Sequence, residues 1–421
     1  VLDAGGAGRV LLIRRGTKVT IANLTVTGGK FTVPAAKTKD DEIADAVGGG
    51  IAAYGELILD TVAVTGNEVI GGAGFGGANG KNGANGKAGT NGKFARCSGN
   101  SGKCPNRAYG RGGSHGSNGG PGEPGGRAGG AWGGGLYSNN HLTIRNSVFS
   151  ANRAIGGTGG KGGNGGKGGN GGRGGNSSTF FNTQGLGKCY SVPGGSGGSG
   201  AYGYYGANGG QGGNAFGGAL FAYGSDGARI SISNVIVLAN AATVGTGGMR
   251  GEGGARGEAG GGGKGAKAEK KCVFPGGNSR SGSKGKVGGA GKPGNPGNPG
   301  FSFGGAIALN TRGADIANVV VSGNNARHGG AFYLQGSAAL RHATIVGNQA
   351  QDKGGAALTY IRSSNDVTIA NSLVWGNKAG KGEPAADPAA DLGGTVQFAR
   401  WEWGENAKSL INPRLQASCI E

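Results

Sequence analysis

Cysteine and histidine carry the most reactive side chains of this chain, and both are few and unevenly placed. Four of the five cysteines lie where glycine-rich runs reverse direction: Cys97, Cys104, Cys189 and Cys272. They show no CxxC spacing, so a metal site is the weaker alternative. Thiols that gather beside aromatic residues are typical of disulfides in an oxidising, extracellular protein. We expect the pairs Cys97–Cys104 and Cys189–Cys272, and the state of Cys419 stays open.

The titratable residues form no catalytic pattern. The four histidines are far apart in the sequence, and His342 replaces an asparagine that recurs elsewhere. Polysaccharide lyases with a β-helix place acidic calcium ligands in one register, but here the aspartates do not recur in one register: Asp60, Asp226, Asp315 and Asp366. Matches to GxGxxG mean nothing in a chain with 106 glycines. The sequence therefore predicts no catalytic residue, no cofactor and no metal, and a carbohydrate-active enzyme stays only an alternative.

A repeated asparagine indicates elements that hold side chains in register. Short copies such as LDTVAVTGN (59–67), ISNVIVLAN (232–240) and IANVVVSGN (316–324) end on it, and their Val, Ile and Leu alternate with small or polar residues. A β-rich repeat of this length that cannot bury its own apolar face predicts a solenoid. Asparagines at one place in each turn would form a hydrogen-bonded ladder. The expected members are Asn67, Asn152, Asn240, Asn324, Asn348 and Asn377.

A second pattern is a glycine at every third position. It holds without a miss from Gly71 to Gly92, returns from Gly110 to Gly125, and recurs in two further out-and-back pairs. This period is typical of an extended helix with three residues per turn and a bare glycine face. A disordered linker does not require strict phase, and collagen needs far more proline than 12 residues in 421. We therefore expect antiparallel rods packed as a polyglycine-II bundle.

The two patterns combine into one architecture. Each glycine-rich arm leaves just after a repeated asparagine and returns just before the next GG-plus-apolar start. The predicted fold is all-β: a right-handed parallel β-helix over residues 1–67, 134–152, 217–240 and 304–421, with arms at 68–133, 153–216 and 241–303. Turns of a β-helix stack at about 4.8 Å, a spacing that backbone-bonded rods also need. Outgoing legs should form one layer of three and returning legs another.

The starts GGAL (217–220), GGAI (304–307) and GGAF (329–332), with the closing SLINPRLQ (409–416), resemble chlamydial polymorphic outer-membrane proteins and other bacterial surface right-handed β-helix proteins. This resemblance covers about 230 residues and implies fold and a surface location rather than a function. The triplets resemble the snow-flea antifreeze protein and some phage adhesin tips. Because triplets are low in complexity, that likeness is architectural.

The positive charge is concentrated in the arms. The formal net charge is +20, and the three arm ranges hold 23 of the 42 Lys and Arg but five of the 22 acids, a net +18. Such charge serves solubility or attracts a polyanion, such as acidic polysaccharide or a cell surface. Nucleic acid is the weaker choice because no binding motif accompanies the charge. The candidate contacts are Lys81, Lys87, Lys93, Lys161, Lys167, Arg173, Lys264, Lys284 and Lys292.

These features together favour a secreted structural or adhesive surface protein. We expect no membrane span, and Val1 looks like a mature start without a signal peptide. The strand-like runs at 10–13 and 19–26 have no amphipathic capping segment before them, so an uncapped turn is expected to pair with another copy in a fibre or sheath. An ice-binding protein is the second alternative, although Lys and Arg in many triplets argue against a flat ice-binding face.

Overall fold

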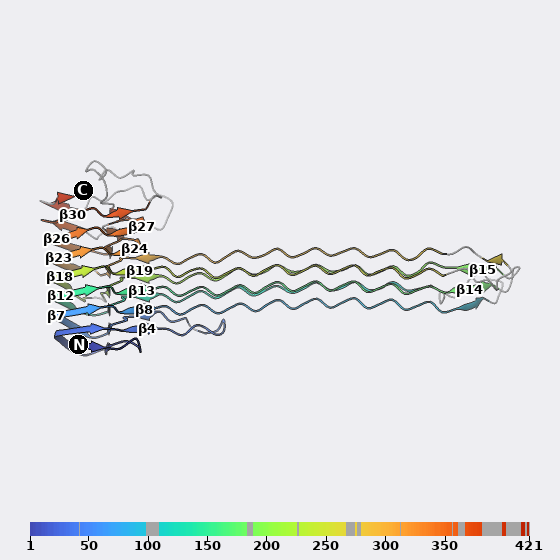
Figure 1. Ribbon diagram of the computed structural model, residues 1–421, viewed down its shortest axis with the longest axis horizontal. Coiled ribbons are helices and arrows are strands. Elements are labelled where there is room, and N and C mark those ends of the chain that lie inside the picture. Colours follow the sequence, from blue (N-terminus) through green and yellow to red (C-terminus); the bar gives the residue numbers. More distant parts are fainter. Residues whose placement is uncertain are drawn as a thin grey trace.

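The computed structural model of the chain is all-β, with parallel strands in stacked sheets and no helix among the residues it describes. The structure describes all residues except 42, 98–108, 183–187, 225–226, 267–273, 276–278, 312, 356, 361–366, 381–397, 401–413, 417–418 and 421. Figure 1 shows a stack of strands at one end and long parallel legs that project from one side of it.

The first sheet contains the repeated asparagine copies. Its long strands are β3 (Lys18–Thr27), β7 (Glu56–Thr65), β12 (Leu142–Ser150), β18 (Ile230–Leu238), β23 (Ala314–Ser322) and β26 (Ala338–Val346). Shorter strands extend it: β1 (Leu2–Asp3), β29 (Val367–Ala370), β30 (Leu373–Trp375), β33 (Arg414–Gln416) and β34 (Cys419–Ile420). Leu142 pairs with Leu57 below and Ile230 above, so equivalent apolar residues of successive copies stack in the core.

The second sheet begins at the GG-plus-apolar starts. It has eight parallel strands: β2 (Leu11–Ile13), β6 (Ile51–Ala53), β11 (Leu136–Ser138), β17 (Leu220–Tyr223), β22 (Ile307–Asn310), β25 (Phe332–Gln335), β28 (Ala357–Tyr360) and β32 (Phe398–Arg400). Ile51, Leu136, Leu220 and Ile307 are at most 2% exposed and belong to the same core as the first sheet. The order of strands is consistent with a parallel β-helix, as the sequence predicts.

The third sheet shows where the arms are inserted. Its outgoing strands are β4 (Lys30–Thr32), β8 (Glu68–Ile70), β13 (Arg153–Ile155) and β19 (Ala241–Thr243); its returning strands are β5 (Ala46–Val47), β10 (Ala131–Trp132), β16 (Ala215–Phe216) and β21 (Ser302–Phe303). β24 (Asn325–His328) pairs with β19 at Asn325 and with β21 at His328. β27 (Gln349–Lys353) and β31 (Lys378–Ala379) continue this sheet beyond β24.

One strand in the later turns is therefore two half-strands in the earlier ones, and each arm is inserted between the halves. The boundaries expected at 68 and 133 place both half-strands in the arm, whereas in the structure the first leg begins after β8, about three residues beyond the asparagine. A shorter insertion, residues 33–45, separates β4 from β5 in the same way. It lies against the first long arm through the Ala36 N–H, which donates to the Ala73 carbonyl at 2.9 Å.

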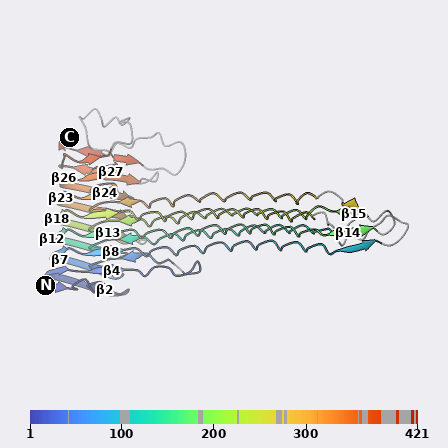
Figure 2. The ribbon, with the colours of Figure 1, turned by 45° about the vertical axis from the view of Figure 1, so that its right-hand side comes forward.

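The arms run as six extended legs. Outgoing legs 1, 2 and 3 are residues 71–92, 156–177 and 244–266, and returning legs 1, 2 and 3 are residues 109–130, 192–214 and 279–300. Figures 1 and 2 show them side by side over their whole length. None has strand pairing of the ordinary kind, yet backbone N–H groups of every leg donate to carbonyls of neighbouring legs with a period of three residues.

These backbone hydrogen bonds define two layers. Within the outgoing layer, leg 1 donates to leg 2 and leg 2 to leg 3, as in Gly80 N–H to Asn164 O and Gly165 N–H to Glu252 O, both 2.8 Å. The returning legs are joined in the same order. Between the layers, Gly166 N–H donates to Gly120 O at 2.8 Å. Outgoing leg 2 and returning leg 2 each contact four other legs and form the centre of the assembly.

Glycine is required at the contact positions because the backbones approach too closely for a side chain. A Cβ on Gly165 would lie 2.0 Å from the Tyr204 carbonyl oxygen, and one on Gly166 would lie 2.0 Å from that of Lys81. By contrast, Gly76 and Gly261 have no atom within 4 Å of an added Cβ. The first two positions of each triplet in outgoing leg 2 face other legs, and the third faces solvent.

A small sheet closes the far end of the legs. It consists of β9 (Ala95–Cys97), β14 (Thr179–Asn182), β15 (Lys188–Ser191) and β20 (Phe274–Pro275), so all three arms contribute to it. Cys104 and Cys272 lie outside the residues that the structure describes, and of Cys97 and Cys189 only their places in β9 and β15 are described. The two predicted disulfides therefore stay predictions.

Candidate functional site

The repeated asparagines form a buried chain of hydrogen bonds along the stack. The side-chain Nδ2 of Asn152 donates to Asn240 Oδ1 at 3.0 Å, and the backbone N–H of Asn152 donates to the same oxygen at 2.9 Å. The pattern repeats at every step between successive members: Asn67, Asn152, Asn240, Asn324, Asn348 and Asn377. All six side chains are at most 1% exposed. The ladder satisfies polar groups at a buried corner and has no group available for chemistry.

A second, exposed row of asparagines bends the long strands. Asn146, Asn234 and Asn318 have φ of 53–55°, and the Nδ2 of each later one donates to Oδ1 of the one before. The bend shifts the alternation by one residue, so Ile232 and Val235 on either side of Asn234 are both buried. His342 occupies this place in β26 with φ 53° and contacts Asn371, which explains the substitution noted in the sequence. Asparagine tolerates the left-handed region better than most residues.

The third residues of the outgoing triplets form a solvent-facing surface, here called the outgoing face. Asparagine side chains cross it as rungs: Asn164 N–H donates to Asn79 Oδ1 at 2.8 Å, and Glu252 N–H donates to Asn164 Oδ1 at 2.9 Å. The same arrangement recurs six residues further along at Asn85 and Asn170. The side chains therefore fix the lateral register of the three outgoing legs and present a polar surface.

The nine candidate basic residues do not form one patch. All nine are exposed, but their positions within the triplets place them on different sides. Lys161, Lys167, Arg173 and Lys264 occupy third positions on the outgoing face; Lys81, Lys87 and Lys93 occupy second positions along the edge between outgoing leg 1 and returning leg 1. Lys292 lies on the opposite, returning side, and Lys284 lies at the outer edge of returning leg 3. Seven of the nine therefore lie on the outgoing face or along its edge with returning leg 1.

The third residues of returning legs 1 and 2, with their neighbours on returning leg 3, form a second surface, here called the returning face. His115 Nδ1 accepts from Ser199 N–H at 2.8 Å, and Asn118 Oδ1 accepts from Tyr202 N–H at 3.0 Å, so these residues share rungs. Tyr202 and Tyr205 are 65% and 59% exposed on returning leg 2. This surface is not among the sites predicted from the sequence, although three tyrosines stand within four residues of a glycine-triplet run.

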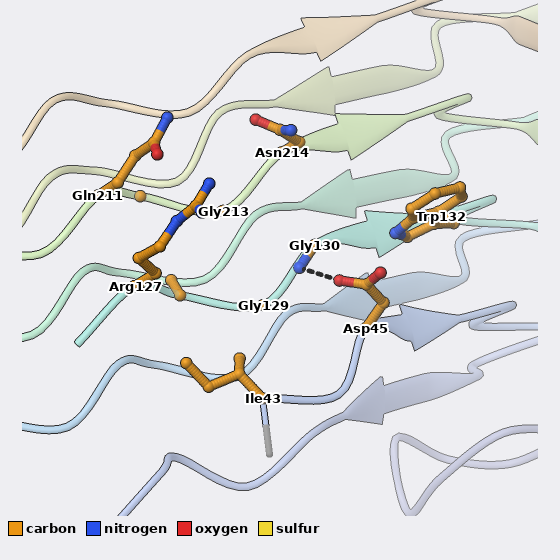
Figure 3. A pocket seen from close by; sticks show the side chains of 11 residues that line it. Ile43, Asp45, Arg127, Gly129, Gly130, Trp132, Gln211, Gly213 and Asn214 are labelled. Atoms are coloured by element: carbon orange, nitrogen blue, oxygen red, sulfur yellow. Dashed lines mark hydrogen bonds between the residues drawn. The ribbon is translucent and has the colours of Figure 1, made fainter. Parts of the chain in front are cut away.

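The returning face ends at the stack in a cleft of about 320 Å³. Figure 3 shows its walls: Trp132 from β10, Asp45 and Ile43 from the short insertion, Arg127 from returning leg 1, and Gln211 with Asn214 from returning leg 2. Asp45 Oδ1 accepts the Gly130 N–H at 2.6 Å, which fixes the carboxylate at the mouth. The buried indole Nε1 of Trp132 has no hydrogen-bond partner among the described residues and lies on the ring side nearest Asp45.

Aromatic packing holds Trp132 in place. Its ring lies 4.7 Å from Phe221 edge-on and 5.1 Å from Phe216, and Phe216 lies 5.1 Å from Phe303 in turn. Trp132, Phe216 and Phe303 stand on consecutive returning half-strands, where the register aligns Trp132 with Phe216 and Phe216 with Phe303, and Phe221 comes from β17. The cleft therefore has a rigid aromatic wall and a polar opposite wall.

The described residues contain no group of three or more His, Cys, Asp or Glu side chains placed to hold a metal ion. The histidines are dispersed, and Nδ1 of His141 accepts the Arg229 N–H at 3.1 Å. Among the same residues there is no helix of the length and apolarity needed to cross a membrane.

Comparisons with known proteins identify no family. No protein-family model matches the chain, and no curated protein sequence matches it, so the resemblance to outer-membrane repeats gains no support. One solved structure found by the search is a springtail antifreeze protein from Granisotoma rainieri, described as a bundle of nine polyproline type II helices. The identity is 20%, over 54% of this chain and 94% of that chain, and the TM-score is 0.06. A TM-score this low carries no argument about fold or function.

Proposed function

We propose that this chain is an extracellular structural or adhesive surface protein, built as a right-handed parallel β-helix that carries a polyglycine-II bundle. The observation that carries the proposal is the continuous backbone bonding between six legs, which makes a stiff projection. At about 3.1 Å per residue, a leg of 22 residues reaches about 68 Å from the stack. Such a projection displays its faces and its far end at a distance from the body, as surface attachment requires.

The outgoing face supports binding to a polyanion. Lys161, Lys167 and Arg173 follow one another at six-residue intervals along the central outgoing leg, about 19 Å apart. In the legs, Glu252 and Glu258 form ion pairs with Arg250 and Arg256 at 3.8 and 3.9 Å. The two arginines partly neutralise these acids, so the acids repel a polyanion less. A regular row of cations on a stiff rod favours an acidic polysaccharide or an acidic cell surface.

Binding to alginate and hyaluronan tests this proposal. The variant with Lys161→Gln, Lys167→Gln and Arg173→Gln should bind at least about tenfold more weakly, and its affinity should fall less steeply with salt. The matched control removes three cations from elsewhere on the legs, by Lys284→Gln, Lys286→Gln and Lys292→Gln. Equal weakening by both variants would reduce the effect to net charge, and absence of any binding by the native protein would refute the proposal.

The first turn supports self-association. An apolar cleft of about 610 Å³ lies between β2 and the first half of β3 and is lined by Leu11, Leu12 and Val19 among others. In the described chain β2 pairs only with β6, so its other edge carries unpaired backbone groups. Leu12 is 53% exposed at this edge. We propose that a second copy covers this end of the stack.

Analytical ultracentrifugation tests the end-to-end contact. The native protein should associate at increasing concentration, and Leu12→Lys should shift it toward monomer, since it places a charge in the apolar cleft. Ile236→Lys, at a residue 40% exposed on β18, is the control for an added lysine on the stack. A native protein that stays monomeric throughout would contradict the self-association.

The regular spacing of the third residues along the legs also favours a second candidate, an ice-binding protein. Third residues recur about every 9.3 Å along each leg, a regularity that suits a lattice. Lysine and arginine side chains stand on both faces, however, and tyrosines stand on the returning face, so neither face is flat. Thermal hysteresis of the native protein distinguishes the two functions, and we expect none.

A further inference from the structure

The returning face differs from the outgoing face in a way that the polyanion proposal does not use. The third positions of returning leg 2 are all uncharged: Ser196, Ser199, Tyr202, Tyr205, Asn208, Gln211 and Asn214. The equivalent row on the outgoing face alternates cations with asparagines. We propose that the row from Tyr202 to Asn214, together with the Trp132 cleft at its end, binds a single chain of a neutral, linear polysaccharide.

Tyr202 is built as a flat platform. A Cβ added to Gly289 on returning leg 3 would lie 2.7 and 2.8 Å from the Tyr202 ring carbons Cδ1 and Cε1, so the ring occupies the space that a side chain there would fill. The neighbouring residues at this place in returning leg 3, Lys286 and Lys292, carry side chains. The ring therefore lies against the leg with 65% of the residue exposed. The apolar face of a sugar ring packs on an aromatic surface of this kind.

Tyr205 continues the platform one triplet further on. It is 59% exposed, and the ring of Tyr204 meets it edge-on at a centroid distance of 5.8 Å, which limits how the Tyr205 ring turns. The two platform residues are three residues apart, or about 9.3 Å along the leg. That spacing is comparable to the length of a disaccharide, so alternate sugars of one extended chain can stack on the two rings.

Near the two tyrosines, residues other than glycine occupy positions where the legs contact one another. Ala201, Tyr204 and Ala207 occupy positions of returning leg 2 that are glycine in its flanking triplets. The hydrogen bonds from returning leg 1 lengthen there, to 3.1 Å for Gly119 N–H to Tyr202 O and 3.5 Å for Gly122 N–H to Tyr205 O, against 2.9 Å at Gly125. The legs thus give up good backbone bonding at the aromatic segment, a cost that a purely structural rod has no reason to carry.

Amide side chains follow the rings toward the stack. Asn208 Oδ1 accepts the Asn295 N–H at 2.8 Å, and Asn214 Oδ1 accepts the Phe301 N–H at 2.9 Å. These bonds fix each side chain and leave its NH2 group as a donor for hydroxyl oxygens. Gln211 lies between them in the same row, so the donors repeat at the triplet spacing.

The cleft provides the end of this row. Gln211 and Asn214 line it on one side, and Trp132 and Asp45 on the other. The charges of Asp45 and Arg127, which both line the cleft, balance one another, and the aromatic wall beside these polar groups suits a neutral sugar. Single-stranded nucleic acid requires cations along the whole row as well as stacking; here Lys286 and Lys292 flank Tyr202, but the row from Tyr205 to Asn214 is uncharged, so a neutral glycan fits better.

Affinity electrophoresis and calorimetry with defined neutral glycans test the site. The probes are xylan, hydroxyethyl cellulose and chito-oligosaccharides, with alginate and oligo-dT as the alternatives. We expect the native protein to bind at least one neutral glycan, and the Tyr202→Ala, Tyr205→Ala double variant to lose at least tenfold in affinity. Tyr223→Ala removes a tyrosine that is 46% exposed on the stack and should change nothing.

The outcomes separate this proposal from the polyanion one. The triple variant of the outgoing face should bind the neutral glycan normally, and the tyrosine double variant should bind alginate normally. Because both tyrosines are exposed, an unchanged melting temperature checks that the fold is intact. No neutral glycan bound, or an unchanged affinity in the double variant, would overturn the inference. Oligo-dT binding that depends on the two tyrosines would assign the site to nucleic acid instead.

Discussion

The stack of parallel strands and the glycine legs are held together by opposite means. In the stack, apolar side chains fill the interior: Leu57, Ile144 and Phe332 are at most 1% exposed. In the legs the buried atoms are mostly backbone, and a Cβ at a contact glycine would lie about 2 Å from a neighbouring carbonyl oxygen. The stack therefore depends on which side chains are present, and the legs depend on their absence.

The comparison also shows how one region supports the other. Each leg continues a half-strand of the third sheet, so the strand spacing of the stack passes directly into the spacing of the legs. The legs have no apolar core of their own to bring them together. Their register is set where they leave the stack, and the hydrogen bonds between them propagate it outward.

The largest effect should come from a side chain placed inside the legs. Gly166→Leu should destabilise the protein by about 3–5 kcal/mol, because the side chain separates backbones and breaks their bonds. Gly261→Leu, in the same bundle but with no atom within 4 Å of the added Cβ, should cost under about 0.5 kcal/mol. Chemical unfolding monitored by far-ultraviolet circular dichroism measures both. Equal effects of the two substitutions would show that leg packing is not backbone-limited.

A polar substitution tests the stack. Asn240→Ala should cost about 3 kcal/mol, since it removes the acceptor of the Asn152 N–H and the donor to the Phe149 and Leu238 carbonyls in a buried place. Asn234→Ala, in the exposed row, loses mainly a residue suited to positive φ and should cost about 1 kcal/mol. Thermal unfolding of the two variants side by side decides; a larger loss for Asn234→Ala would contradict the role of the buried ladder.

A glycine in place of Ala239 should increase the stability of the stack. Ala239 has φ 52°, while the residues before the ladder asparagine in the following turns are Gly323, Gly347 and Gly376, all at φ of 60–66°. Ala239→Gly removes the left-handed strain and should raise stability by about 0.5–1 kcal/mol, less than the full strain because glycine loses more entropy. Gly323→Ala should do the reverse. Calorimetric melting temperatures that move in the other direction would refute the strain argument.

The smallest effect concerns acid stability. The Asn146 side chain, then Arg145, hold the pKa of Asp60 below its ordinary value through hydrogen bonds to the carboxylate. Because the folded-state pKa is depressed, the contribution to stability is present above the unfolded pKa of about 3.9 and is lost as pH falls through the folded value. Asn146→Ala should raise the pKa of Asp60 in an NMR titration. The pKa of Asp41, lowered by the Thr38 and Lys37 backbone N–H groups, should stay unchanged.

The sequence sufficed for features that repeat and fell short for those that depend on register. Alternating apolar residues and GG starts predict an all-β, parallel architecture, and this is confirmed. The asparagine positions could be predicted because the same residue recurs at the same place in each copy. The split third strand was not, since Ala131 and Ala154 look like arm residues until β24 shows the uninterrupted form.

The surfaces depend on contacts between legs more than 80 residues apart. Lys81 and Lys161 look alike in the sequence, yet one is a second residue of its triplet at an edge and the other is a third residue on the outgoing face. Three separate segments line the cleft at Trp132, and one of them is the short insertion 33–45, which the sequence repeats do not predict. Such sites follow from the register, which sequence periodicity alone does not determine.

Site-resolved amide hydrogen exchange in the legs tests the central claim most directly. In outgoing leg 3 the N–H groups of Gly248, Gly251, Gly254 and Gly257 donate to returning leg 2, whereas no leg accepts from those of Arg250 or Ala255 among the described residues. The account predicts slow exchange at these glycines and fast exchange at Arg250 and Ala255. The N–H groups of Glu252 and Glu258 should also exchange slowly, because they donate to Asn164 and Asn170 Oδ1. In outgoing leg 2, Gly165 and Gly166 donate to neighbouring backbones and the Lys167 N–H donates to Asn82 Oδ1, so all three should exchange slowly. Uniformly fast exchange along the legs, while the stack stays protected, would contradict it.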